Sequence, residues 1–363
     1  MKFDKYLASI EDTPEIITYI AAAPVTIVLF FAVTNIKDGI CLKKDFNTKN
    51  TQKVLMTPEI IEKHSDVDKT RLSKFRNALV YSIFIEKLNK MFSRSNLKNF
   101  YNNINSLKIG TNPIGHIDGI EAYYKPENNT IYFCRNGYNI EIVFHELLHM
   151  ASTICKNGMV YCGFSQKKKY SRKVIGAGLT EGYTQLLTRR MYKDTYEYRY
   201  YTEVEIAKII ETIIGKEKME NLYFNANLKW LVEELSKYSD EQETLKFIKR
   251  LDFITKYETN KENNTRREEI LLVEAYKDVY TFLLKTYVEQ QKELYRKNEI
   301  DKEEFINRIA NYIYDIKLDS YRGDYNLLNK KNKDEIIKSI LIDSEYNTKV
   351  QEKLYTVHMK NSN

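Results

Sequence analysis

Two histidines four residues apart are the part of this sequence best suited to metal chemistry. Residues 143–150 read VFHELLHM, so Glu146 directly follows His145 and precedes His149. Positions i and i+4 of a helix share one face, which lets both imidazoles bind a single zinc ion at about 2.0–2.1 Å. Glu146 points about 100° around the helix axis, where its carboxylate can take a proton from a zinc-bound water. The pattern therefore indicates hydrolysis of a carbonyl compound at a zinc ion, with Glu146 as general base.

The residues around these three groups are apolar, which predicts that the helix is buried. They are Ile142, Val143, Phe144, Leu147, Leu148 and Met150. Two histidines and a glutamate satisfied within a core without metal are the alternative interpretation. Burying three such groups unpaired would cost several kcal/mol, so the surroundings favour a metal site.

A catalytic zinc needs a third protein ligand, and Glu181 is the predicted one. The next histidine after His149 is His358, which excludes a third histidine nearby. Glu181 lies in residues 176–188, GAGLTEGYTQLLT, whose apolar residues give a helix one apolar side. The glycines of this segment allow the helix to approach the motif helix closely. Later acids such as Glu203 lie in charged stretches typical of solvated helices, so they are weaker candidates. The alternative interpretation of Glu181 is a solvated residue in the first turn of its helix.

Two polar residues one turn beyond Glu181 are candidates to orient a histidine ligand. Thr184 and Gln185 both carry side-chain oxygens that can accept a hydrogen bond from an imidazole N–H. Such hydrogen bonds fix the ring and its tautomer in metal sites.

With its downstream glutamate helix, the HELLH motif resembles the gluzincin metallopeptidases, whose zinc ligands are the two histidines and that glutamate. The resemblance covers residues 121–192, about a fifth of the chain. It implies a Zn²⁺-dependent peptidase acting on a peptide or protein substrate. It also implies that the strand before the motif helix, residues 130–135, lies along the cleft and pairs with the substrate backbone. Gln185 stands where the family often has an acidic residue, and the 31 residues between His149 and Glu181 exceed the spacing of its best-known members.

The resemblance further implies a tyrosine or histidine that stabilises the oxyanion of the transition state. The sequence leaves the choice open among five tyrosines beyond Glu181, which are Tyr183, Tyr192, Tyr196, Tyr198 and Tyr200.

The elements that must position these residues predict an α+β fold. Residues 121–135 read as a hairpin around a Pro-Glu-Asn-Asn turn, and Asn139 is the expected N-cap of a helix ending near Cys155. A glycine-containing loop then leads to a helix beginning near Leu179. We assign residues 71–200 to a zincin-like catalytic domain with a small sheet, whose first helices fall in 70–103. Residues 201–363 have helical periodicity and form a mainly helical lobe, with expected helices at 203–215, 222–238, 268–296 and 302–316.

The N-terminal segment raises the question of a membrane anchor. Residues 16–36 contain no charge and would reach about 31 Å as a helix, enough to span a bilayer. A buried pair of strands is the alternative, because the run is rich in β-branched residues and includes Pro24. Lys37, Lys43, Lys44 and Lys49 follow the run at the start of the polar linker 37–70, whereas only Lys2 and Lys5 precede it. They predict a single-pass anchor with a cytoplasmic catalytic domain, and without an anchor the protein is expected in the cytoplasm.

The charge and the cysteines of the chain further limit the classes of function. The net charge of +7 is well mixed along the chain, so no nucleic-acid partner is expected. The four cysteines have no CxxC spacing and are expected as free thiols, with a pairing of Cys155 and Cys162 across a short glycine-containing loop as the alternative. A membrane-anchored, catalytically inactive zincin-fold binding or scaffold protein is the alternative function, although such a protein has no need for Glu146. Proteolysis within the membrane is disfavoured by the charged Glu141 next to the motif.

Overall fold

The computed structural model of the chain describes residues 78–111, 122–133, 140–192, 200–259, 266–315, 321–322, 325–326, 328, 330–341, 349–350 and 352–353. The predicted membrane segment 16–36 and the linker 37–70 lie outside them. Among the helices that are described, none has the length and apolar character needed to cross a membrane. The chain forms two compact units: unit 1 is Met1–Val174, Thr184–Glu197 and Glu220–Asn227, and unit 2 is Ile175–Tyr183, Tyr198–Met219 and Leu228–Asn363.

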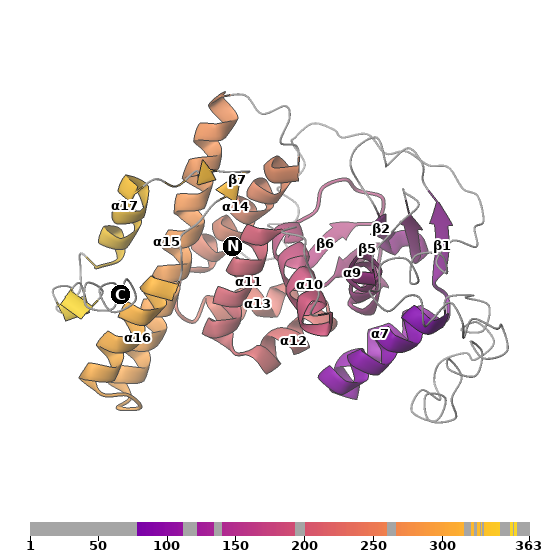
Figure 1. Cartoon of the computed structure of the whole chain (residues 1–363), viewed down its shortest axis with the longest axis horizontal. Helices are drawn as coiled ribbons and strands as arrows, with labels where there is room; N and C mark the ends of the chain where they lie inside the picture. Colours follow the sequence, from indigo (N-terminus) through magenta and orange to yellow (C-terminus); the bar gives the residue numbers. More distant parts are fainter. Residues whose placement is uncertain are drawn as a thin grey trace, which may run out of the picture. The chain divides into compact units, whose positions relative to one another are not determined.

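Unit 1 contains a small sheet with the strand order β1-β3-β2. Its strands β1 and β2 are labelled in Figure 1. Strand β1 (Lys108–Thr111) runs parallel to β3 (Thr130–Phe133), and β2 (Ala122–Lys125) runs antiparallel to it. The β2–β3 hairpin turns at a short 3-10 helix, Pro126–Asn128, as the sequence predicted. However, β3 is paired on both edges, so its backbone hydrogen bonds are already used within the sheet. The expectation that this strand pairs with a substrate is therefore wrong for Thr130–Phe133.

Helix α9 (Ile140–Ala151) carries the two histidines and is buried from Glu141 to Ala151. It packs against α7 (Ala78–Met91) and α8 (Lys98–Ile104), which follows the 3-10 helix Arg94–Leu97. An aromatic cluster joins the three helices, because the ring of Phe84 lies 5.2 Å from Phe144 and 6.0 Å from Phe100. A helix that is apolar on most sides must be buried, so the sequence around the motif explains its central place in unit 1.

The end of α9 differs from the prediction, since the helix stops at Ala151 rather than near Cys155. The hydroxyl groups of Ser152 and Thr153 donate to the carbonyl of His149, which supplies partners for the last turn. The following residues form an antiparallel sheet of β4 (Thr153–Lys156), β5 (Met159–Cys162) and β6 (Ser165–Lys168). The loop predicted for this stretch is therefore wrong.

Helix α10 (Ala177–Met191) carries Glu181 and uses two glycines for close packing. A Cβ atom on Gly178 would lie 2.9 Å from the backbone oxygen of Leu251. A Cβ atom on Gly182 would lie only 2.2 Å from the backbone oxygen of Glu203. The expected role of the glycines is thus corrected: they bring α10 close to α14 and α11 rather than to the motif helix.

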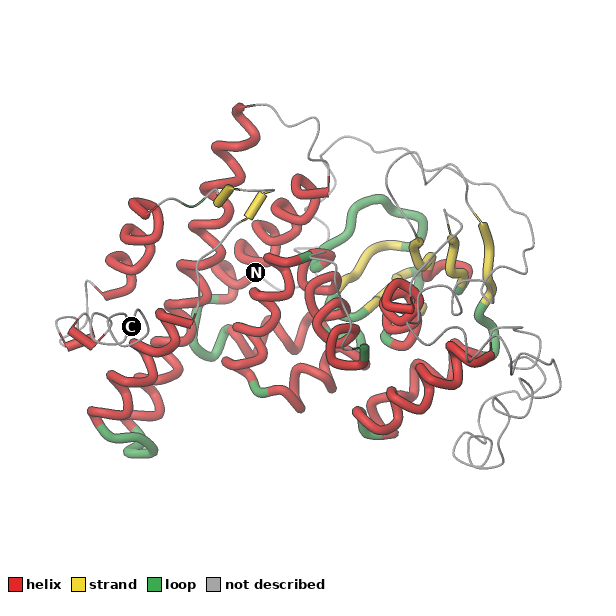
Figure 2. The backbone as a smooth tube through the Cα atoms, in the orientation of Figure 1, coloured by secondary structure: helices red, strands yellow, loops and turns green. Residues whose placement is uncertain are grey.

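Unit 2 is mainly helical, in agreement with the predicted helical lobe (Figure 2). Its central element is the long helix α15 (Arg266–Arg296), against which several neighbours pack. The other elements that contribute to it are the first residues of α10, α11 (Tyr201–Ile214), the first residues of α12 (Lys216–Phe224), α13 (Leu228–Leu235), α14 (Glu241–Thr259), α16 (Lys302–Asp315), β7 (Tyr321–Arg322), β8 (Tyr325–Asn326) and α17 (Lys330–Leu341). Gly215 ends α11 as predicted, with φ of 89°. Where one helix was expected over 222–238, α12 and α13 are separate, and Ala226 between them has a left-handed backbone.

With sheets and helices in unit 1 and a mainly helical unit 2, the α+β class is confirmed.

Candidate metal centre

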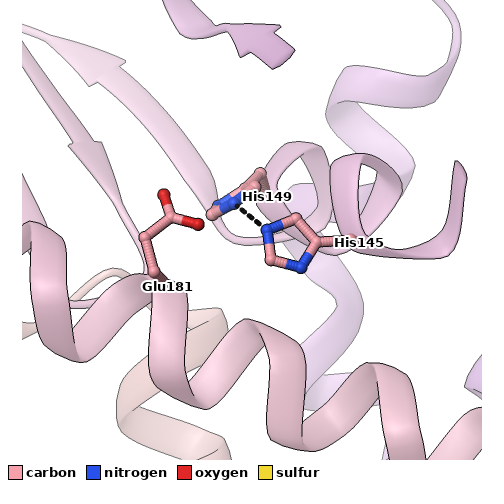
Figure 3. Close-up of side chains that lie close together, drawn as sticks. All are labelled: His145, His149 and Glu181. Carbon is pink, nitrogen blue, oxygen red and sulfur yellow. Dashed lines mark hydrogen bonds between the residues drawn. The ribbon is translucent and has the colours of Figure 1, made fainter. Parts of the chain in front are cut away.

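His145 and His149 of α9 and Glu181 of α10 come together as a group that could hold a metal ion. One ligand atom from each residue lies within 4.8 Å of the other two. Figure 3 shows the Glu181 carboxylate directed at the imidazoles of the two histidines. The histidines are buried, each 7 % exposed, whereas Glu181 is only partly buried.

The donor set and its spacing fit zinc. Two imidazole nitrogens and a carboxylate oxygen are typical ligands of a catalytic zinc, and tetrahedral coordination sets such atoms about 3.3–3.5 Å apart. The Nε2 atoms of His145 and His149 are already 3.0 Å apart. In its residue types and in the spacing of its ligand atoms, which all lie within 4.8 Å of one another, the group therefore fits the predicted ion.

His145 is held by Gln185, which lies one turn after Glu181 on α10. Its Nδ1 atom is 2.8 Å from the Gln185 Oε1 atom. The amide nitrogen of Gln185 in turn donates to the carboxylate of Glu141, in the first turn of α9. Gln185 had been named from the sequence as a candidate to orient a histidine, and it contacts His145 directly. Glu141 had not been given this role, although its position four residues before His145 places both on one helix face.

His149 is surrounded by groups from the end of α9 and from β5. The Cys162 Sγ atom lies 3.7 Å from its Nδ1 atom and donates to its backbone carbonyl at 3.4 Å. No signal in the sequence connects Cys162 with the site, because the sheet that brings β5 back to α9 was predicted as a loop. Neither Cys162 nor Cys155 forms a disulfide, which confirms the expected free thiols among the cysteines described.

Thr184 contacts a tyrosine rather than a histidine. Its hydroxyl lies 2.6 Å from that of Tyr223, a fully buried residue of α12. Burial raises the pKa of Tyr223 to about 12, so the phenol is neutral at physiological pH. The pair fills the interior beside Gln185 and fixes this part of α10.

The tyrosines considered for oxyanion stabilisation occupy different environments. Tyr183 is fully buried and donates to the Glu211 carboxylate at 2.9 Å. Tyr192 is half-buried, with its ring edge-on to Phe144 at 6.1 Å. Tyr200 precedes α11 in a left-handed backbone conformation. Tyr196 and Tyr198 lie outside the described residues.

Glu146 and Glu203 are both buried. Glu146 follows His145 on α9 and is 6 % exposed. Glu203 is 1 % exposed, so the expectation of a solvated residue is wrong. It is buried because Gly182 lets the backbone of α10 rest directly on α11 at this residue.

Comparisons of the chain with protein-family models, with curated proteins and with solved structures gave no match. The convergence of His145, His149 and Glu181 is therefore the observation from which a function can be proposed.

Proposed function

We propose that this protein is a zinc-dependent peptidase of the gluzincin type. The observation that carries the proposal is the group of His145, His149 and Glu181, brought together from two helices. These residues match the ligand set of that family in type and in order along the chain. The substrate class, a peptide or protein, follows from this resemblance.

The three ligands would hold the ion and leave one position for water or substrate. Zinc supplies Lewis acidity, which polarises a carbonyl group and makes a water molecule easier to deprotonate. Glu146 accepts the proton of the attacking water and delivers it to the leaving amine.

The partial exposure of Glu181 supports an accessible site rather than a structural one. A structural zinc is usually closed by four protein ligands, of cysteine and histidine type. In the described residues the metal-ligating group has three members. Cys162 contacts the Nδ1 side of His149, away from the Nε2 atom that faces His145. An open fourth position is what hydrolysis requires.

The test compares the full chain with Glu146→Gln, which is nearly isosteric and cannot act as a base. Zinc content is measured first, then cleavage of a denatured protein such as casein and of a quenched-fluorescent peptide library. We expect equal zinc content and turnover reduced by a factor of about 10²–10⁴. Turnover unchanged in Glu146→Gln would contradict the role of Glu146. Zinc binding without any cleavage by the wild type would support the inactive binding or scaffold protein instead.

A further inference from the structure

A second pair of residues lies one helical turn away from the metal ligands. On α9, Glu141 precedes His145 by four residues, and on α10, Gln185 follows Glu181 by four. Each helix thus presents a ligand and, one turn along, a member of the pair Glu141–Gln185. Both residues of this pair are buried, with exposures of 4 % and 2 %. The carboxylate of Glu141 accepts from Gln185, and Gln185 contacts His145.

The hydrogen bond to Glu141 decides which way round the Gln185 amide lies. An ionised carboxylate only accepts hydrogen bonds, so it must face the NH₂ group of the amide. The amide oxygen then faces His145, and it can only accept. His145 must consequently carry its proton on Nδ1, and its Nε2 atom keeps a lone pair directed toward His149 and Glu181. The reversed amide would place the proton on Nε2 and block metal binding.

We propose that Glu141 is a positioning residue of the metal site, acting through Gln185 to hold His145 in its metal-binding tautomer. The inference rests on the metal centre proposed above and extends it. A carboxylate hydrogen-bonded to a ligating histidine would fix the ring directly, but here the amide of Gln185 makes that hydrogen bond. The carboxylate of Glu141 is hydrogen-bonded to this amide and acts on the ring of His145 through it. Negative charge behind the ring also strengthens the imidazole as a ligand.

The test moves the carboxylate from position 141 to position 185. Glu141→Gln removes the charge with little change in shape, and its amide can face Gln185 either way. The double variant Glu141→Gln with Gln185→Glu restores one carboxylate, now in contact with His145. Glu220→Gln is a matched control, since Glu220 is also buried, on α12, and has no part in this chain of contacts to His145. Circular dichroism and thermal unfolding verify that all variants are folded.

Zinc affinity is measured on the full chain by competition with a chromophoric chelator. We expect about a tenfold loss in Glu141→Gln, recovery to within about threefold of wild type in the double variant, and no change in Glu220→Gln. A merely structural role for Glu141 gives no reason for this recovery. Wild-type affinity in Glu141→Gln, or a double variant no better than Glu141→Gln, would overturn the proposal.

The tautomer of His145 gives a second readout that does not depend on zinc. Long-range ¹H–¹⁵N spectra of zinc-free protein labelled at histidine distinguish protons on Nδ1 and Nε2. We expect the Nδ1–H form of His145 in wild type and in the double variant, and a mixture in Glu141→Gln. A wild type that shows the expected tautomer but binds no zinc would contradict the proposed function and leave the positioning role intact. Nε2–H in the zinc-free wild type would overturn the positioning role itself.

Discussion

The Nε2 atoms of His145 and His149 lie 3.0 Å apart, with their rings inclined at 74°. This contact follows from the four-residue spacing on α9, which places both rings on one side of the helix. Where both rings carry their protons on Nδ1, the two Nε2 lone pairs face each other. A cation between them turns that repulsion into coordination, with Glu181 as the third ligand.

Replacement of Gly182 by alanine is expected to destabilise the protein. Alanine normally favours a helix interior by about 1 kcal/mol over glycine. Here, however, the new Cβ atom would lie 2.2 Å from the backbone oxygen of Glu203, and backbone cannot move aside as a side chain can. We expect a net loss of about 3 kcal/mol or more in the free energy of unfolding, measured by urea denaturation.

Gly158→Ala is the control for this substitution. Gly158 has φ of 72°, but an added Cβ atom would meet nothing within 4 Å. Only the backbone conformation opposes the change, so we expect a loss of about 1 kcal/mol. Equal or greater stability in Gly182→Ala than in Gly158→Ala would contradict the close packing of α10 on α11.

The carboxylate of Asp252 on α14 is expected to make stability depend on pH. It accepts hydrogen bonds from the backbone N–H groups of Gly176 and Gly178, at the start of α10. Although part of the residue reaches solvent, burial raises the pKa of Asp252 to about 7, against the opposing effect of these N–H groups. In the unfolded chain the pKa is about 3.9. The folded protein therefore binds the extra proton between about pH 4 and pH 7, and this contribution to stability is lost as pH rises through 7.

The measurement is urea unfolding of wild type and Asp252→Asn at several pH values from 4.5 to 8. Because asparagine does not titrate, the stability of wild type relative to the variant should fall as the pH rises. A relative stability that stays constant or rises over this range would show that the pKa of Asp252 is not raised.

The two described cysteines are expected to differ in reactivity. Cys155 on β4 is exposed, whereas Cys162 on β5 is buried against His149. Burial of part of its thiol nevertheless raises the pKa of Cys155, so its alkylation should be slow at pH 7 and accelerate as the pH is raised. Peptide mapping after timed treatment with iodoacetamide should show labelling of Cys155 well before Cys162. Equal rates in the folded protein would contradict the burial of Cys162.

The sequence was sufficient where the determining interactions are local. The spacing of His145 and His149 placed them on one helix face, and the apolar residues between them predicted its burial. Glu181 could be chosen because alternatives were few. The hairpin over 121–135 was recognisable from its turn residues, and long periodic segments such as α15 were predicted within two residues at their ends.

Features that depend on contacts distant along the chain could not be predicted in the same way. The sheet of β4, β5 and β6 has short strands with mixed polarity, and its register is set by pairing rather than by local pattern. The burial of Glu203 follows from Gly182 on another helix, so it could not be predicted from the sequence of α11. Glu141 meets Gln185 only because α9 and α10 pack at this level. The position of β3 between two strands likewise required the third strand, β1, to be placed.

The most direct measurement is the zinc affinity of the full chain with and without Glu181. The wild type should bind about one zinc per chain, as metal analysis after equilibrium dialysis would show. Glu181→Ala removes one of three ligands, so affinity should fall by at least about a hundredfold while the helix content is unchanged. Glu233→Ala is the control, because this α13 residue has a side chain that is 57 % exposed. Its affinity should equal that of the wild type. Zinc bound equally well by Glu181→Ala, or not bound by the wild type, would contradict the metal centre.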